Sequence, residues 1–144
     1  MTQTLTGQDI GQASYAVRAV LDRVLERTGT GFRPWVAVNV LGSNGSQLDE
    51  GDLLARIVHG LKITEPEARE VLADVLDQGL AERSAATQLS LTPAGTTRFQ
   101  QLTAAITQIT ERLYGGLPAD ELAAAHRMLT AVTARANAEL DAQR

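Results

Sequence analysis

The chain has 144 residues, a formal net charge of −4 at pH 7 and no cysteine. This length fits one domain or one protomer of a tightly joined dimer, and the lack of cysteine excludes disulfides and cysteine metal sites. No apolar run approaches the ~18 residues of a membrane span. The N-terminus also lacks the basic segment and apolar core of a secretion signal. We therefore expect a soluble, cytoplasmic protein without a membrane partner.

Three amphipathic helices are predicted in the first part of the chain. The first covers about residues 6–28, where apolar side chains recur every three or four positions. The second starts near Pro34, which suits a first helical position, and ends at the glycine-rich turn of residues 42–45. The third begins around Asp49 and continues to about Leu61.

The run Thr64–Glu67 predicts the start of a fourth helix. Thr64 can accept a hydrogen bond from the backbone N–H of residue 67, while the Glu67 side chain can reach back to the Thr64 N–H. Apolar residues then recur at helical spacing as far as Gly79, which suits the left-handed position after a helix.

Two short strands are predicted after this helix, over residues 80–84 and 88–91, with residues 85–87 at the tip of a hairpin. A further helix starts at Thr92-Pro93. Two helices, a hairpin and another helix in this order are typical of a winged helix-turn-helix, a module that usually reads duplex DNA. The predicted fold is therefore mainly α with a small β-hairpin wing.

The last third of the chain predicts two long helices with apolar seams. The seam of the first is Phe99, Leu102, Ile106, Ile109 and Leu113, and the seam of the second is Leu122, Ala125, Leu129, Val132, Ala136 and Leu140. The middle of the chain is too small to bury both seams, so we expect a two-fold homodimer with interleaved terminal helices. The alternative is an intramolecular bundle. Residues 1–31 and 96–144 are accordingly assigned to dimerisation helices, and residues 32–95 to the winged helix-turn-helix, in one intertwined domain.

Four segments resemble the MarR family of bacterial transcription regulators, and the resemblance covers nearly the whole chain. They are residues 61–64 (L-K-I-T), 79–80 (G-L), 91–95 (L-T-P-A-G) and 116–122 (G-L-P-A-D-E-L). The resemblance implies an obligate homodimer that binds a pseudo-palindromic operator in double-stranded DNA as a repressor. It also implies release of the DNA by a small aromatic or anionic ligand.

The candidate DNA-binding residues lie on the predicted recognition helix, just before it and on the wing. They are Lys62, Thr64, Glu65, Glu67, Arg69, Glu70, Arg83 and Thr87. Arg69 can donate two hydrogen bonds to guanine, or it can pair with Glu65 one turn away. The glutamates can accept from cytosine amino groups, or complement the helix dipole. Lys62 and Arg83 are candidate phosphate contacts.

The candidate ligand-binding residues follow from the position of the family's pocket between the dimer helices and the winged module. They are Tyr15, Arg18, Trp35, Asn39 and His59. Arg18 can anchor a carboxylate, and His59 can supply a pH-sensitive contact. The alternatives are a solvated Arg18, an exposed His59 and a Trp35 that fills the core.

The charge distribution opposes DNA binding. Residues 46–98 hold nine acidic and five basic residues, so the predicted DNA-reading part carries the whole negative excess. The wing tip, residues 84–88, is uncharged where family members usually have a basic tip. Because nucleic-acid binders normally show the reverse, the alternative function is a winged-helix dimer that has lost DNA binding. Such a dimer would serve as a ligand-binding or protein-interaction module with an acidic recognition helix.

Catalytic chemistry is not indicated. The sequence holds no nucleophile elbow, phosphate loop or zinc-ligand spacing, and its two histidines are too few for a catalytic or metal constellation. We predict no enzyme activity, no catalytic residue, no metal site and no cofactor.

Overall fold

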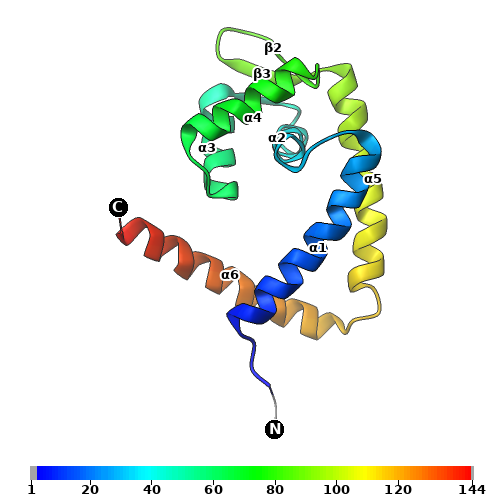
Figure 1. Ribbon diagram of the computed structural model, residues 1–144, viewed down its shortest axis with the longest axis vertical. Coiled ribbons are helices and arrows are strands. Elements are labelled where there is room, and N and C mark those ends of the chain that lie inside the picture. Colours follow the sequence, from blue (N-terminus) through cyan, green and yellow to red (C-terminus); the bar gives the residue numbers. More distant parts are fainter. Residues whose placement is uncertain (1–2, 144) are drawn as a thin grey trace. The chain divides into compact units, whose positions relative to one another are not determined.

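A computed structural model describes residues 3–143 (Figure 1). The described chain forms six helices and one small antiparallel sheet, which confirms the predicted mainly helical winged fold. Residues 1–107 and 108–144 form two compact units. The elements are α1 (Gly7–Thr28), α2 (Phe32–Ser43), β1 (Gln47–Asp49), α3 (Glu50–Leu61), α4 (Glu65–Asp77), β2 (Ala81–Arg83), β3 (Gln88–Leu91), α5 (Pro93–Tyr114) and α6 (Ala119–Ala142).

Most helix ends fall where the local caps predict them. The Thr6 side chain accepts from the Asp9 N–H at 3.2 Å, and the Asp9 carboxylate accepts from the Thr6 N–H at 2.9 Å, which completes a capping box for α1. Helix α2 departs from the prediction because it begins at Phe32, which makes Pro34 its third residue. Proline is tolerated there because the first N–H groups of a helix have no intrahelical acceptor.

The sheet has a third strand that the sequence did not predict. The strand order is β1-β3-β2, with both pairs antiparallel, and Leu48 of β1 lies opposite Leu89 of β3. Strand β1 has only three residues, so its sequence holds no readable alternation. It becomes a strand because β3 supplies its hydrogen-bond partners. The wing is therefore fastened to the segment that leads into α3.

The core of residues 1–107 lies among α2, α3, α4 and the sheet. The Trp35 ring stacks on Phe99 of α5, with ring centroids 6.5 Å apart, and Gly42 leaves room for the Phe99 ring. The largest fully buried side chains are Leu25, Val38, Leu41, Leu53, Ile57, Val75, Leu89 and Leu102. Burying apolar surface of this kind stabilises the fold and fixes how α4 is presented.

The start of α5 packs against the base of the wing. A Cβ atom at Gly95 would lie 1.8 Å from the backbone oxygen of Leu80, so only glycine allows this approach. The Thr92 hydroxyl donates to the Gly79 oxygen at 2.6 Å and accepts from the Gly95 N–H at 3.0 Å. These contacts join the end of α4, the first wing strand and α5.

Residues 108–144 hold the end of α5, the turn at Gly115–Pro118 and α6. None of the described residues of α6 is buried. Across the described part of the chain, no helix has both the length and the apolarity needed to cross a membrane.

Candidate nucleic-acid interface

The N-terminus of α4 is held by a cap and by an ion pair. The Glu67 N–H donates to Thr64 Oγ1 at 3.3 Å, and the Thr64 hydroxyl donates to Glu67 Oε1 at 3.1 Å. Arg33 of α2 reaches the other carboxylate oxygen at 3.3 Å. The hydrogen bond from the Thr64 hydroxyl is the largest influence on Glu67 and lowers its pKa. Desolvation opposes it, and the Thr64 backbone N–H and Arg33 lower the pKa further, so that the net shift is downward. Glu67 is thus engaged in positioning the helix.

Arg69 and Glu65 form the second ion pair of α4. Arg69 Nη2 lies 2.7 Å from Glu65 Oε1, and the two side chains are 60% and 63% exposed. An exposed pair one turn apart on a helix contributes only about 0.3–0.5 kcal/mol. The pair therefore contributes little to the stability of the fold.

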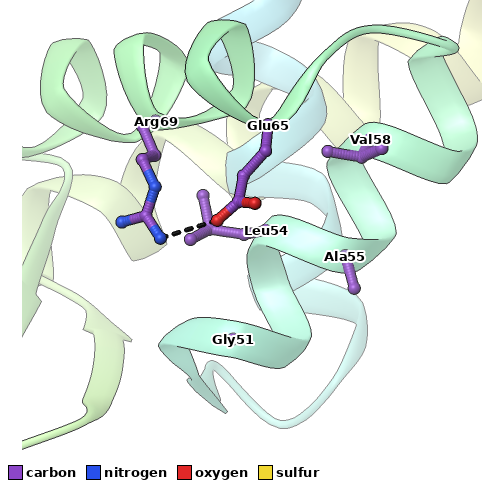
Figure 2. Close-up of a pocket in the computed structure, with 6 residues that line it drawn as sticks. All are labelled: Gly51, Leu54, Ala55, Val58, Glu65 and Arg69. Carbon is purple, nitrogen blue, oxygen red and sulfur yellow. Dashed lines mark hydrogen bonds and ion pairs between the residues drawn. The ribbon is translucent and has the colours of Figure 1, made fainter.

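The pair lies beside an open hollow of about 330 Å³ between α3 and α4. Figure 2 shows both side chains extending from α4 toward the first turns of α3. The hollow is lined by Gly51, Leu54, Ala55, Val58, Glu65 and Arg69. Arg69 therefore lies on the flank of α4 that faces α3, away from the middle of the outward face.

The outward face of α4 is acidic. The exposed residues along the middle of this face, here called the crest of α4, are Pro66, Glu70, Ala73 and Asp77. They are spaced four, three and four residues apart, which places them on one side of a helix. A surface of this kind repels phosphate groups.

Arg83, the basic residue of the wing, also forms an ion pair. Arg83 Nη1 lies 2.9 Å from Glu50 Oε1 at the start of α3, and the Glu50 side chain is only 25% exposed. The Glu50 N–H donates to the Thr87 carbonyl at 2.7 Å. Arg83 and Thr87, two of the candidate DNA-binding residues, therefore both contact Glu50 at the N-terminus of α3.

The remaining basic residues of the module have different roles. Lys62 caps α3 in a left-handed conformation with a φ of 57°. Arg56 donates to the Asn44 side chain at 3.3 Å. Arg98 of α5 donates to the hydroxyl of Thr30, which is buried in the turn between α1 and α2. Arg98 thus links α5 to the buried turn between α1 and α2.

The five candidate ligand residues lie in unlike surroundings. Trp35 is buried against Phe99, while Asn39, His59 and Tyr15 are exposed, Tyr15 to 80%. Arg18 lies 3.4 Å from the centroid of the Phe32 ring and 2.9 Å from Asp22. None of the five lines the hollow beside α4.

Sequence reasoning missed three residues that shape this surface. They are Arg33, which holds Glu67, Glu50, which holds Arg83, and Phe32, which carries Arg18. Arg33 and Glu50 are separated from their partners by more than 30 residues. No local spacing pattern links residues so far apart in the chain, so no signal in one sequence could have found these pairs.

No family model and no curated protein matches the sequence. Solved structures match the fold over nearly the full length. The S. aureus MepR–DNA complex has a TM-score of 0.76 at 18% identity, over 90% of this chain and 96% of that chain. NadR in complex with 4-hydroxyphenylacetate has a TM-score of 0.72 at 19% identity, over 90% and 95% of the two chains. The reduced form of MarR from E. coli has a TM-score of 0.68 at 16% identity, over 91% and 95%.

These likenesses establish the fold. The chain has the winged-helix fold of MarR-type transcriptional regulators, as its sequence segments indicated, and several further structures with this fold are transcriptional regulators.

Proposed function

We propose that the protein is a homodimeric transcriptional regulator that binds a pseudo-palindromic operator and acts as a repressor. The observation that carries this proposal is the fold, because a structural neighbour with a TM-score of 0.76 is a DNA complex. A winged helix places the N-terminal part of its recognition helix at base edges in the major groove. In this chain, that part holds the capped first turn at Thr64 and the Glu65–Arg69 pair.

The homodimer is supported by apolar side chains without intrachain cover. The large hydrophobic residues exposed in residues 108–144 are Leu113, Tyr114, Leu117, Leu122, Met128, Leu129, Val132 and Leu140. A subunit interface would cover exposed apolar side chains of this kind. We assign residues 1–31 and 96–144 to the dimer contacts and residues 32–95 to the DNA-reading module.

Phosphate contacts are assigned to Lys62, Arg83 and the wing residue Thr87. Each phosphate neutralised adds about 0.9 to the salt slope of binding. Because Arg83 pairs with Glu50 in the free protein, a phosphate group must replace that partner. We therefore expect modest affinity that falls steeply with salt.

The proposed effector is a small aromatic or anionic molecule that releases the DNA. NadR, a structural neighbour, was solved with 4-hydroxyphenylacetate. Here Arg18 is the group suited to a carboxylate, since it is 45% exposed and already lies over the Phe32 ring. Tyr15 is largely exposed three residues before it in α1. Trp35, Asn39 and His59 complete the candidate set.

A second function is favoured by the acidic crest of α4. With Glu70 and Asp77 on its outward face, α4 would bind a basic protein surface better than a polyanion. The protein would then be a winged-helix dimer that acts through protein or ligand contacts without binding DNA.

Fluorescence anisotropy with duplexes tiled across the region upstream of the gene, at two salt concentrations, separates the two functions. Saturable, sequence-dependent binding that weakens sharply at the higher salt is expected for the regulator. A lack of binding to every duplex at low salt would overturn it in favour of the acidic interaction module.

A further inference from the structure

The Glu65–Arg69 pair is a net-neutral arrangement of donors and acceptors on the recognition helix. The carboxylate and the guanidinium are in contact at 2.7 Å and are both mostly exposed. The contact uses one hydrogen of Arg69 Nη2. The guanidinium carries five N–H donors, so one hydrogen on Nη1 and one on Nη2 remain for a second bidentate partner. Glu65 Oε1 accepts this one hydrogen bond and keeps a second lone pair with which it can accept another.

The pair therefore presents three groups in a fixed order: donor, donor, acceptor. The major-groove edge of a G·C pair presents the complementary order, which is guanine N7 and O6 as acceptors followed by the cytosine N4 amino group as donor. An A·T pair presents acceptor, donor and acceptor instead. Only G·C in one orientation satisfies all three groups at once.

The ion-pair distance also fits this edge. Guanine O6 and cytosine N4 of one base pair are joined by a hydrogen bond of about 2.9 Å. The 2.7 Å between Arg69 Nη2 and Glu65 Oε1 closely matches that spacing. A carboxylate alone would be repelled by the phosphates, but its charge is balanced here by the guanidinium it contacts.

We propose that Glu65 and Arg69 act as one reading unit for a single G·C pair in each operator half-site. Arg69 donates to N7 and O6 of the guanine, and Glu65 accepts from N4 of its paired cytosine. This inference rests on the proposed function and names the base pair that this acidic recognition helix requires. It gives Glu65 a role in specificity besides its ion pair.

The test is selection of binding sites from a random duplex pool with the full-length protein, followed by dissociation constants for duplexes that vary the selected position. The wild-type protein is expected to require G·C in one orientation at one position of each half-site. Each other base pair there should weaken binding on the order of ten- to hundredfold. Arg69→Ala should bind all four pairs nearly alike. Glu65→Gln, whose amide can also donate to thymine O4, should lose part of the preference against A·T while Arg69 keeps the rest.

A base analogue isolates the contact itself. Replacing the selected guanine by 7-deazaguanine, which lacks the N7 acceptor, should weaken the wild-type complex and leave the Arg69→Ala complex unchanged. Arg56→Ala and Glu82→Gln, at exposed positions of α3 and β2, are the charge-matched controls and should keep the wild-type preference.

The outcomes separate this inference from the proposed function. Selection of a clear operator without a G·C position that depends on Arg69 and Glu65 would overturn the reading unit and leave the regulator standing. Failure to select any duplex would overturn both.

Discussion

At the residue scale, Glu67 shows how a pattern local in the sequence can predict the contacts of one side chain. Its place three residues after Thr64 predicts a capping box, and the structure shows the Thr64 side chain bonded to the Glu67 N–H. The carboxylate also meets the Thr64 hydroxyl and Arg33. A glutamate engaged in this way positions the helix and has little capacity left to read a base.

The cap gives a prediction for stability. Thr64→Ala removes the acceptor for the Glu67 N–H and is expected to lower the free energy of unfolding by about 1 kcal/mol. Thr97→Ala, at an exposed position inside α5, is the control and should have a much smaller effect. Urea unfolding followed by circular dichroism measures both. Equal losses in the two variants would contradict the cap.

The lowered pKa of Glu67 gives a prediction for pH. A carboxyl group whose pKa falls on folding stabilises the protein above its ordinary value of 4.5, and this contribution is lost as pH falls through the lowered pKa. Glu67→Gln should therefore be less stable than the wild type at neutral pH, and the difference should shrink below pH 4.5. Thermal unfolding between pH 7 and pH 3 tests this, and a difference that grows in acid would refute it.

At the element scale, the wing is defined by contacts that lie far apart in the chain. Strand β1 pairs with β3, and Gly95 of α5 lies against the wing base at Leu80. The Glu50–Arg83 pair adds a link between α3 and β2. The hairpin thus has a fixed direction relative to α3 and α4.

Two glycine substitutions test the packing at the wing base. Gly95→Ala places a Cβ against a backbone oxygen that cannot move aside, and should destabilise the protein by about 3 kcal/mol. Gly60→Ala lies within α3 with nothing close to the new Cβ, and should stabilise it by roughly 0.5–1 kcal/mol. Calorimetry of both variants provides the comparison. Similar melting temperatures would disprove the close approach at Gly95.

The Glu50–Arg83 pair gives a prediction for DNA binding. Glu50→Gln frees Arg83 for a phosphate, so operator affinity should rise several-fold and the salt slope should steepen by about 0.9. Glu82→Gln changes the net charge equally and leaves the pair intact, so its effect should be smaller. Anisotropy titrations at several salt concentrations measure both. The same salt slope for Glu50→Gln and the wild type would contradict the view that the Glu50–Arg83 pair restrains Arg83.

At the scale of the whole molecule, stability and function are proposed to depend on a second copy of the chain. No described residue of α6 is buried, although its apolar seam repeats over its length. An isolated amphipathic helix gains most of its stability from tertiary packing. The proposed two-fold dimer would supply that packing and, at the same time, a second reading module for the other half-site.

The dimer prediction is tested on α6. Leu129→Asp with Val132→Asp places two charges in the apolar seam and is expected to give a monomer at micromolar concentration with sharply reduced operator binding. Ala131→Asp, on the opposite face by helical spacing, should remain dimeric. Sedimentation velocity distinguishes them. A wild-type protein that sediments as a stable monomer would exclude the homodimer.

The sequence by itself determined most of the elements of this protein. The caps at Thr6 and Thr64, the stop at Gly79 and the start at Pro93 are local signals, and the helices begin and end within two residues of them. Such signals can be read from the chain because the groups that satisfy a helix end lie within four residues of it. The winged topology follows from the order of these elements.

Only the tertiary structure decided how the recognition surface is arranged. It added β1, turned Arg69 toward α3, left Glu70 and Asp77 on the outward face, and paired Arg33 and Arg83 with distant acids. Each of these features depends on a partner brought near by folding of the core. Local patterns carry no information about such partners, because packing between elements sets the rotation of a helix and the neighbours of its side chains.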